Sequence, residues 1–378
     1  MTGPLSGCRV LDLGIITAGA ATSAMLADLG AEVIKVESPG YHDPFRRWSG
    51  PGGGDDSPFF RFTNRNKAGI GIDIKRPEGR AVFMRLVAGS DVVVENFRRG
   101  VLATLGIDYP QLRAVRPSII LASLSSHGEF GPDANRVSFG TTLEAMSGLA
   151  AETGYPGGKP TVSGRDLNYP DQVVAIFATG MVVTAWHAAQ HGAGVHLDLS
   201  QRELTSFLLG ERFVQGASGQ PRGNADPLYA LQNCYVSSDQ AWVAVSVEQR
   251  QLPLLAGLVA ESEVGRVEEG LARWMVTRTA AEAVKALAAL CIAAARVRDG
   301  SAAAQGRGIS WCDAIGNLPD GSLAKGFPFQ FEDEPMQLTR PAPSIGQDTA
   351  RVLQELGGYT QQEIAALRKD GVIECASA

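Results

Sequence analysis

The feature that most constrains the fold is a regular alternation of short apolar runs with helix-like segments over the first 125 residues. Residues 8–13 (CRVLDL) and 32–37 (EVIKVE) are typical of buried strands. Between them, residues 20–29 have the spacing of a helix, which Gly30 is expected to end. A strand, a helix and a second strand in this order predict a parallel pair joined by a right-handed crossover.

The alternation continues along the chain. Further strands are predicted at residues 69–74, 91–95, 118–123 and 195–199, and helices at residues 77–88 and 171–190. Residues 39–56 are rich in Gly, Pro, Asp and Ser, which is the composition of a loop, and a loop of this length is usually functional. The chain is therefore expected to be an α/β protein with a Rossmann-like parallel sheet.

The 378 residues are too many for one simple core, so we expect two domains. The predicted large Rossmann-like domain begins with residues 1–215, and the polar residues 216–228 form a linker. Residues 229–325 are predicted to form a smaller α+β domain, with two strands followed by an Ala-, Leu- and Glu-rich helical region. Residues 326–378 are expected to return and pack on the large domain as two short helices.

Composition narrows the classes of function. A net charge of −6 without a long basic run gives no electrostatic footprint for nucleic acid. The five cysteines are scattered without ligand spacing, and His187 and His191 read as a surface pair, so neither disulfides nor a metal site is expected. No run of about 18 uninterrupted apolar residues and no signal-peptide pattern is present, so we expect a cytoplasmic protein without membrane contact.

Seven segments spread over nearly the whole chain carry a specific resemblance. In order they are LSGCRVLDLG, AGAATSAMLADLGAEVIKVESPG, NRNKAGIGIDIKRPEG, VVVENFRRGVLATLGIDY, GKPTVSG, DLSQRE and RPAPSIGQDTARVLQELG. They resemble the class III coenzyme A transferases, a superfamily that includes formyl-CoA transferases, carnitine-CoA transferases and α-methylacyl-CoA racemases. The resemblance implies a Rossmann-like large domain made from both ends of the chain, a small domain, and an interlocked homodimer.

The resemblance also implies an activity and a nucleophile. Enzymes of this family move CoA from an acyl-CoA donor to a carboxylic acid, through a mixed anhydride and a thioester on an aspartate. Asp171 stands at the start of the apolar helix, where the family has that aspartate. Asp166 is the competitor, because residues 164–171 are two residues longer than in oxalate-type members, but Asp171 keeps the spacing to the helix end. No metal or tightly bound cofactor is implied, and CoA is a substrate.

Further positions match family residues that contact CoA or the reacting thioester. The expected CoA contacts are Ile72, Lys75, Asn96, Phe97 and Arg98, with Arg46 in the long loop as a further candidate. Most of them follow strands of the parallel sheet, at the edge where such sheets bind ligands. Thr17, in the loop after the first strand, is expected to donate a hydrogen bond to an oxyanion.

Some positions depart from the family pattern. Ile15 and Thr17 replace the His and Gln of formyl-type members, and Ser38 and Thr104 stand where relatives often carry Arg. These departures disfavour oxalate or formate chemistry and leave open a CoA-binding protein without turnover. A racemase or isomerase is the other alternative, but Phe139 stands where racemases have a histidine, and a phenyl ring cannot transfer a proton.

Overall fold

The computed structural model describes residues 3–48, 57–163, 167–190, 192–212, 221–261, 263–300, 315–319, 321–326 and 338–376. The chain divides into two compact units. Unit 1 comprises Met1–Leu149, Val162–Gln215 and Trp311–Ala378, and unit 2 comprises Ala150–Thr161 and Gly216–Ser310. Residues 150–161 and 216–228 lie in unit 2, and residues 315–325 lie in unit 1, where Lys325 donates a hydrogen bond to Gln172.

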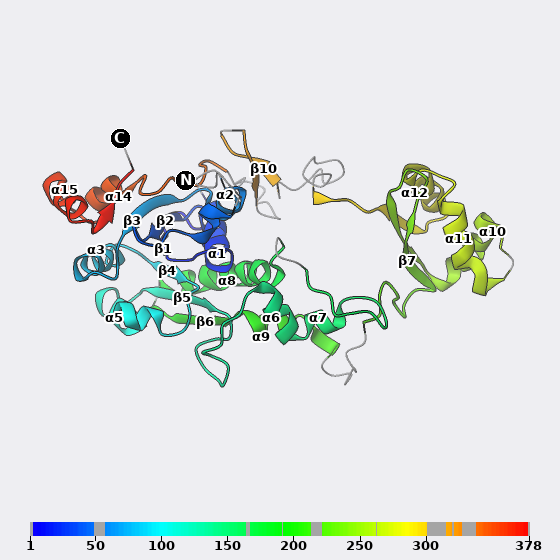
Figure 1. Ribbon diagram of the computed structural model, residues 1–378, viewed down its shortest axis with the longest axis horizontal. Coiled ribbons are helices and arrows are strands. Elements are labelled where there is room, and N and C mark those ends of the chain that lie inside the picture. The colour runs from blue at the N-terminus through cyan, green and yellow to red at the C-terminus, as the bar shows by residue number, and fades with distance from the viewer. Residues whose placement is uncertain are drawn as a thin grey trace. The chain divides into compact units, whose positions relative to one another are not determined.

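Unit 1 is built on a seven-stranded sheet in the order β12-β3-β2-β1-β4-β5-β6 (Figure 1). The strands are β1 (Arg9–Asp12), β2 (Glu32–Glu37), β3 (Ala68–Ile72), β4 (Val92–Glu95), β5 (Ile120–Ser125), β6 (His196–Ser200) and β12 (Ile373–Glu374). All neighbours pair in parallel except β12, which is antiparallel to β3. This architecture confirms the predicted α/β class with a parallel sheet.

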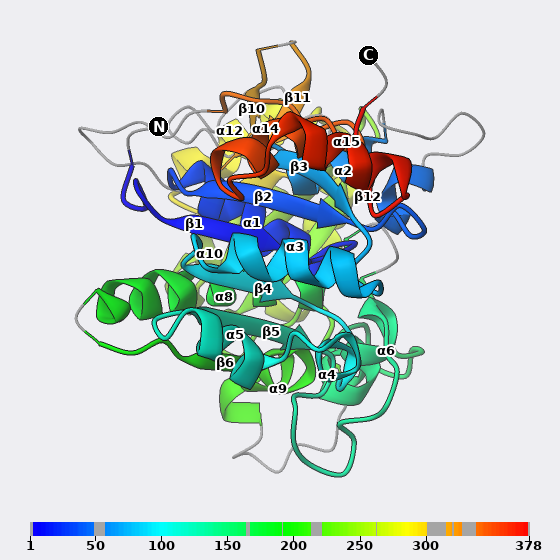
Figure 2. The same ribbon diagram turned by 90° about the vertical axis from the view of Figure 1, so that its left-hand side faces the viewer.

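Helices cover both faces of this sheet (Figure 2). On one face lie α3 (Pro77–Val87) and α5 (Tyr109–Val115), which bury Phe83, Leu86 and Leu112 against the strands. On the other face lie α1 (Ala18–Asp28) and α8 (Tyr169–Ala189), which bury Met25 and Val174. The central strands are mainly apolar on both faces because both are covered, as expected for parallel strands, but Asp12 and Lys35 are buried charges within them.

Shorter elements complete unit 1. They are η1 (Pro44–Arg47), α2 (Pro58–Asn64), α4 (Val101–Leu105), α6 (Gly140–Ser147), α9 (Gln201–Phe207), η2 (Gly210–Arg212), β10 (Ile315–Asn317), β11 (Leu323–Lys325), α14 (Thr349–Glu355) and α15 (Gln361–Lys369). Helix α7 (Leu149–Glu152) begins with a residue of unit 1 and continues with residues of unit 2. The tail forms the two predicted helices, and β12 then joins the sheet edge beside β3. Residues 373–374 therefore join the same sheet as residues 9–12.

Unit 2 contains a three-stranded antiparallel sheet in the order β7-β8-β9, formed by Leu231–Val236, Trp242–Val247 and Ala293–Arg296. Its helical elements are η3 (Gln249–Gln251), α10 (Leu252–Val259), η4 (Val264–Arg266), α11 (Val267–Met275) and α12 (Ala280–Ala289). Val245, Leu255, Leu271 and Leu287 share one apolar core between helices and strands. The pattern predicted β7 and β8 but not β9, whose sequence AAAR has little strand propensity.

Helix α8 is long and apolar enough to cross a membrane by length and composition alone. In this structure it packs along α1 and β5 and buries Val174, Ala178 and Val182 in the core of unit 1. Its opposite face leaves Ile176 and Met181 about half exposed, at 51% and 46%.

Candidate active site

The strand order β3-β2-β1-β4-β5-β6 reverses between β1 and β4. In open α/β sheets, ligands bind at the carboxyl ends of the strands where the order reverses. The segment after β1, residues 13–17, and the segment after β4, residues 96–100, both leave the sheet at this point. The candidate site is therefore built first from these two loops.

The loop after β1 is fixed to its surroundings by hydrogen bonds between its backbone and nearby side chains. The Gly14 N–H donates to Asp12 Oδ1 at 2.8 Å. Asn96 grips Ile15 on both sides, since its Oδ1 accepts from the Ile15 N–H at 2.8 Å and its Nδ2 donates to the Ile15 carbonyl at 3.0 Å. A Cβ on Gly14 would lie 2.4 Å from the carbonyl carbon of Gly19, so only glycine fits there.

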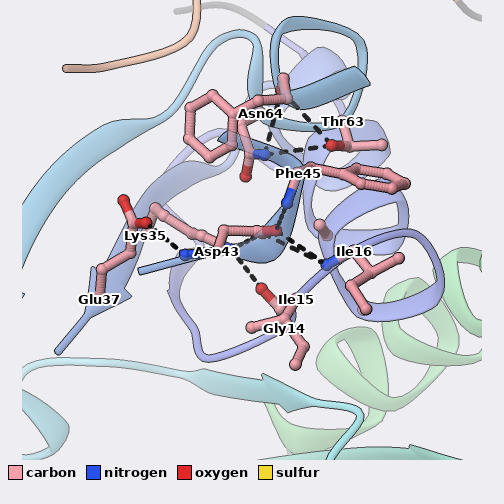
Figure 3. A network of polar contacts seen from close by, with 12 residues as sticks. Gly14, Ile15, Ile16, Lys35, Glu37, Asp43, Phe45, Thr63 and Asn64 are labelled. Atoms are coloured by element: carbon pink, nitrogen blue, oxygen red, sulfur yellow. Dashed lines mark hydrogen bonds and ion pairs between the residues drawn. The ribbon is translucent and has the colours of Figure 1, made fainter. Parts of the chain in front are cut away.

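Buried charges hold the other side of the same loop (Figure 3). Lys35, in the middle of β2, donates from Nζ to the Gly14 carbonyl and lies 3.0 Å from Asp43 Oδ2. The Asp43 carboxylate in turn accepts from the Ile16 N–H, at 3.2 Å to Oδ1 and 3.3 Å to Oδ2. Neither charged side chain of this pair is exposed to solvent.

A pocket of about 310 Å³ opens beside this loop at the ends of β1, β2 and β3. Its wall is mainly apolar and is formed by Leu13, Ile15, Val36, Ile72, Ile74, Phe97, Val101 and Leu105. Six polar residues also line it, namely Glu37, Ser38, Tyr41, Asp43, Asp73 and Lys75. Glu37 and Asp43 are buried and paired with Arg46 and Lys35, whereas the side chain of Lys75 is exposed. Such a pocket suits a ligand with a flat or apolar portion and an anionic group near the rim.

The structure places the predicted CoA contacts in three different settings. Ile72, Lys75 and Phe97 line the pocket, and the side chain of Lys75 is exposed at its edge. Both polar ends of the Asn96 amide bind the Ile15 backbone, so Asn96 fixes the loop after β1. Arg98 is exposed, next to Phe97 but outside the pocket wall.

Arg46 does not have the exposed guanidinium that a phosphate contact requires. It is buried, and Glu37 accepts from its Nε at 3.0 Å and from its Nη2 at 2.6 Å. The guanidinium also donates to the Pro343 carbonyl and lies 3.6 Å above the Phe60 ring. Burial and these contacts make Arg46 a part of the support behind the pocket, so we do not carry it forward as a CoA ligand.

Asp171 lies in the first turn of α8, half-buried between helices. Burial raises its pKa to about 6, and hydrogen bonds from its own N–H and from the Ala18 N–H partly oppose that shift. Ala18 is the first residue of α1, and Gly140, the first of α6, is so close that an added Cβ would lie 3.4 Å from Asp171 Oδ2. The carboxylate thus sits where the N-terminal ends of three helices meet, which favours its anionic form.

Thr17 lies beside the start of α1, whose first N–H donates to Asp171. It is buried and immediately precedes α1, and its Oγ1 accepts from Asn168 Nδ2 at 3.3 Å. Asn168 precedes α8 with a left-handed backbone, φ 45°. Phe139, next to Gly140, has a side chain that is 68% exposed. The competitor Asp166 lies outside the described residues.

Sequence reasoning missed Asp43 and Lys35. A signal was present, because Lys35 interrupts the apolar run EVIKVE, and a lysine in a strand covered on both faces needs a buried partner. It also missed that Gly140 lies next to the Asp171 carboxylate. A single sequence has no local signal for this contact. Among the residues that the structure describes, no three His, Cys, Asp or Glu side chains are grouped to hold a metal ion.

These features define a Rossmann-like α/β protein with a ligand pocket at the switch point of its sheet and a half-buried carboxylate beside it. The family model described as CoA-transferase family III matches residues 5–349. The chain therefore belongs to CoA-transferase family III, as the resemblance of its segments predicted.

Individual relatives agree with this assignment. A "probable CoA-transferase" of Mycobacterium tuberculosis is 31% identical, over 98% of this chain and 50% of that protein. The succinyl-CoA–D-citramalate CoA-transferase of Chloroflexus aurantiacus is 37% identical, over 64% of this chain and 61% of that protein. The chain thus spans between half and two thirds of the length of these two relatives. The crystal structure of a CAIB/BAIF family protein from Brucella suis superposes with a TM-score of 0.84 at 26% identity, covering 94% of this chain and all of that one.

Proposed function

We propose that this protein transfers CoA from an acyl-CoA donor to a carboxylic acid, with Asp171 as the nucleophile. The observation that carries the proposal is the Asp171 carboxylate, half-buried at the meeting point of three helix starts, with a pKa of about 6. Relatives named succinate–glutarate and acetyl-CoA:oxalate CoA-transferases, 37% and 34% identical, support the substrate class of acyl-CoA and carboxylic acid.

The chemistry needs a carboxylate at this place. An oxygen of Asp171 attacks the thioester carbonyl, the CoA thiolate leaves, and a mixed anhydride with the donor acyl group remains. The thiolate then attacks the Asp171 carbonyl carbon, which releases the donor acid and leaves CoA as an aspartyl thioester. The acceptor carboxylate displaces the thiolate to form a second anhydride, and attack by the thiolate on the acceptor carbonyl yields the new acyl-CoA and free Asp171.

The environment of Asp171 fits both demands of this cycle. A pKa of about 6 keeps the carboxylate largely ionised at neutral pH, as a nucleophile must be. Each attack develops negative charge on a carbonyl oxygen, and backbone N–H groups at helix starts stabilise such an oxyanion. The first turn of α1, with Thr17 before it, is the nearest source of those groups.

CoA itself is expected in the pocket beside the loop after β1. Ile72 and Phe97 offer apolar surface to the adenine, and Lys75 offers a cation at the rim to a phosphate. Arg98 is exposed on the same loop as Phe97 and is a further phosphate contact in this proposal. Asn96 contributes indirectly by fixing Ile15.

The test is to trap the covalent intermediate. The protein is incubated with single acyl-CoA donors, including succinyl-CoA and acetyl-CoA, treated with hydroxylamine, digested and mapped by mass spectrometry. We expect a hydroxamate on Asp171 with at least one donor, and none in Asp171→Ala. Asp108→Asn is the matched control, because Asp108 is also a carboxylate at a helix start and caps α5 away from the pocket.

Two alternatives have separate outcomes. CoA binding with no adduct and no transfer from any donor would indicate a CoA-binding protein without turnover. Exchange of the α-proton of an acyl-CoA with solvent, without an adduct, would indicate a racemase or isomerase. Phe139 argues against the latter, because its exposed phenyl ring has no proton to give.

We also propose that two chains form the interlocked homodimer that the family resemblance implies. The exposed apolar face of α8, with Ile176, Phe177 and Met181, supports this, since soluble proteins rarely leave such a face uncovered. Light scattering after size exclusion is expected to give twice the chain mass of 39.9 kDa. Met181→Glu is expected to shift the protein toward monomer, and a monomeric wild type would refute the proposal.

A further inference from the structure

Ile16, in the loop after β1, has a backbone conformation that its side chain disfavours. Its φ is 60°, in the left-handed region. Left-handed geometry is uncommon for any residue other than glycine, and it is a genuine outlier for a β-branched one. Such strain persists only where the surroundings over-determine the conformation, and it gathers at functional sites.

The surroundings that hold Ile16 are a buried ion pair. The Ile16 N–H points at the Asp43 carboxylate, and Lys35 balances that charge from the neighbouring strand (Figure 3). Asp43 Oδ1 also accepts from the Phe45 N–H at 2.9 Å, which fixes the carboxylate in place. Taking two charges fully out of water is expensive, and apolar residues of similar size often serve stability as well or better. Stability alone is therefore a poor explanation of the pair.

The loop held by Asp43 leads directly to the nucleophile. Ile16 is followed by Thr17, whose hydroxyl contacts Asn168, and then by Ala18, whose N–H donates to Asp171. A change of φ at Ile16 would swing these two residues relative to α8, because the rest of α1 is anchored in the core. Displacements of about 1 Å at a reacting group can reduce rates about 100-fold.

We propose that Asp43 is a positioning residue for catalysis: by accepting the Ile16 N–H it holds the left-handed turn that aims Thr17 and the start of α1 at Asp171. The inference rests on the proposed function, since it concerns the placement of the proposed nucleophile. In this proposal Asp43 contacts neither the Asp171 carboxylate nor the thioester carbonyl. It acts through the backbone of the loop. Lys35 serves by holding the buried carboxylate in place through their ion pair.

A matched pair of variants tests the acceptor oxygens of Asp43, which bind the Ile16 and Phe45 N–H groups. Lys35→Met with Asp43→Leu removes both charges and the acceptor, whereas Lys35→Met with Asp43→Asn removes both charges but keeps an acceptor oxygen. The two differ only in that acceptor and in the amide group that carries it. We expect kcat to fall about 10- to 100-fold in the leucine variant, with a much smaller change in the Kd for CoA. The asparagine variant is expected to stay within about threefold of wild-type kcat.

A third substitution tests the role of strain. Glycine adopts a φ of 60° without penalty, so it needs no acceptor to stay there. Adding Ile16→Gly to the Lys35→Met, Asp43→Leu variant is therefore expected to restore kcat at least about tenfold. A role of Asp43 in global stability alone predicts no such rescue, because Ile16→Gly adds no stabilising contact.

Hydrogen exchange gives a readout that needs no substrate. The amides of residues 14–18 are expected to exchange faster in the leucine variant than in the asparagine variant and to match wild type in the latter. Asp28→Asn is the control, since Asp28 forms another buried ion pair, with Arg65, at the far end of α1. It is expected to leave both the exchange of residues 14–18 and kcat unchanged.

Equal kcat and equal exchange in the leucine and asparagine variants would overturn the inference, and so would failure of Ile16→Gly to rescue. Absence of an Asp171 adduct in the wild type would instead overturn the proposed function. Exchange measured without substrate still decides in that case whether Asp43 holds the loop, so the two failures are distinguishable.

Discussion

Replacing the proposed nucleophile is expected to make the protein more stable at neutral pH. In the folded protein burial raises the pKa of Asp171 to about 6, from an ordinary value of 3.8. The folded state therefore holds its proton more tightly than the unfolded state does, and ionisation at neutral pH costs stability. Asp171→Asn keeps the shape of the side chain and an acceptor for the Ala18 N–H but carries no charge.

The magnitude follows from the size of the pKa shift. A shift of about two units corresponds to roughly 3 kcal/mol when the carboxylate is fully ionised in both states, above about pH 7. Solvent reaches part of the side chain and screens the charge, so we expect roughly 1 to 3 kcal/mol. The advantage of Asp171→Asn shrinks to below about 1 kcal/mol near pH 4.5, because the folded wild type is then protonated and uncharged.

The assay is urea unfolding of wild type and Asp171→Asn at pH 7.5 and at pH 4.5, followed by tryptophan fluorescence. The difference between the two proteins at each pH removes the contributions of all other titrating groups. A less stable Asp171→Asn at pH 7.5 would refute the reasoning. A stability gain of equal size at both pH values would do so as well, since it would not come from the charge.

Four other expectations follow from the same geometry. Plotted against pH, kcat/KM should fall about tenfold per unit below pH 6, because protonation removes the nucleophilic form of Asp171; a plateau down to pH 5 would contradict this. Arg46→Ala should lower the free energy of unfolding by roughly 3 kcal/mol, by stranding the buried Glu37, yet leave CoA affinity nearly unchanged. Lys75→Ala should weaken CoA binding in a salt-dependent way, measured by calorimetry, and should leave the free energy of unfolding nearly unchanged. Gly14→Ala should lower the unfolding midpoint and the activity together, because its Cβ would overlap the Gly19 backbone at 2.4 Å, and a fully active Gly14→Ala would show that the loop yields.

The sheet could be predicted because its signals are local. Apolar runs, a helix between them and Gly30 at the helix end identify β1, α1 and β2 to within a few residues. Strand β12 escaped prediction because it has only two residues and pairs with β3, about 300 residues earlier in the chain. No local pattern can announce a partner that distant.

The candidate site was predicted unevenly for the same reason. Asp171 and Thr17 come together in the structure with the start of α1, but the prediction rested on resemblance, and their proximity depends on how α1 and α8 pack. For Arg46, a sequence does not show whether a cation faces solvent or a buried acid, and the structure pairs it with Glu37. Asp43 reads as an ordinary loop residue until the backbone of Ile16 is seen beside it.

The measurement that tests the central claim most directly follows oxygen through a complete turnover. The protein is supplied with an acyl-CoA donor and an acceptor acid whose carboxylate carries ¹⁸O. The mass of the peptide that contains Asp171 is then measured by mass spectrometry. If the reaction passes through anhydrides on Asp171, each turnover leaves one acceptor oxygen on its carboxylate, so the peptide gains mass in steps of about 2 Da. Formation of the new acyl-CoA with an unlabelled Asp171 peptide would contradict the account.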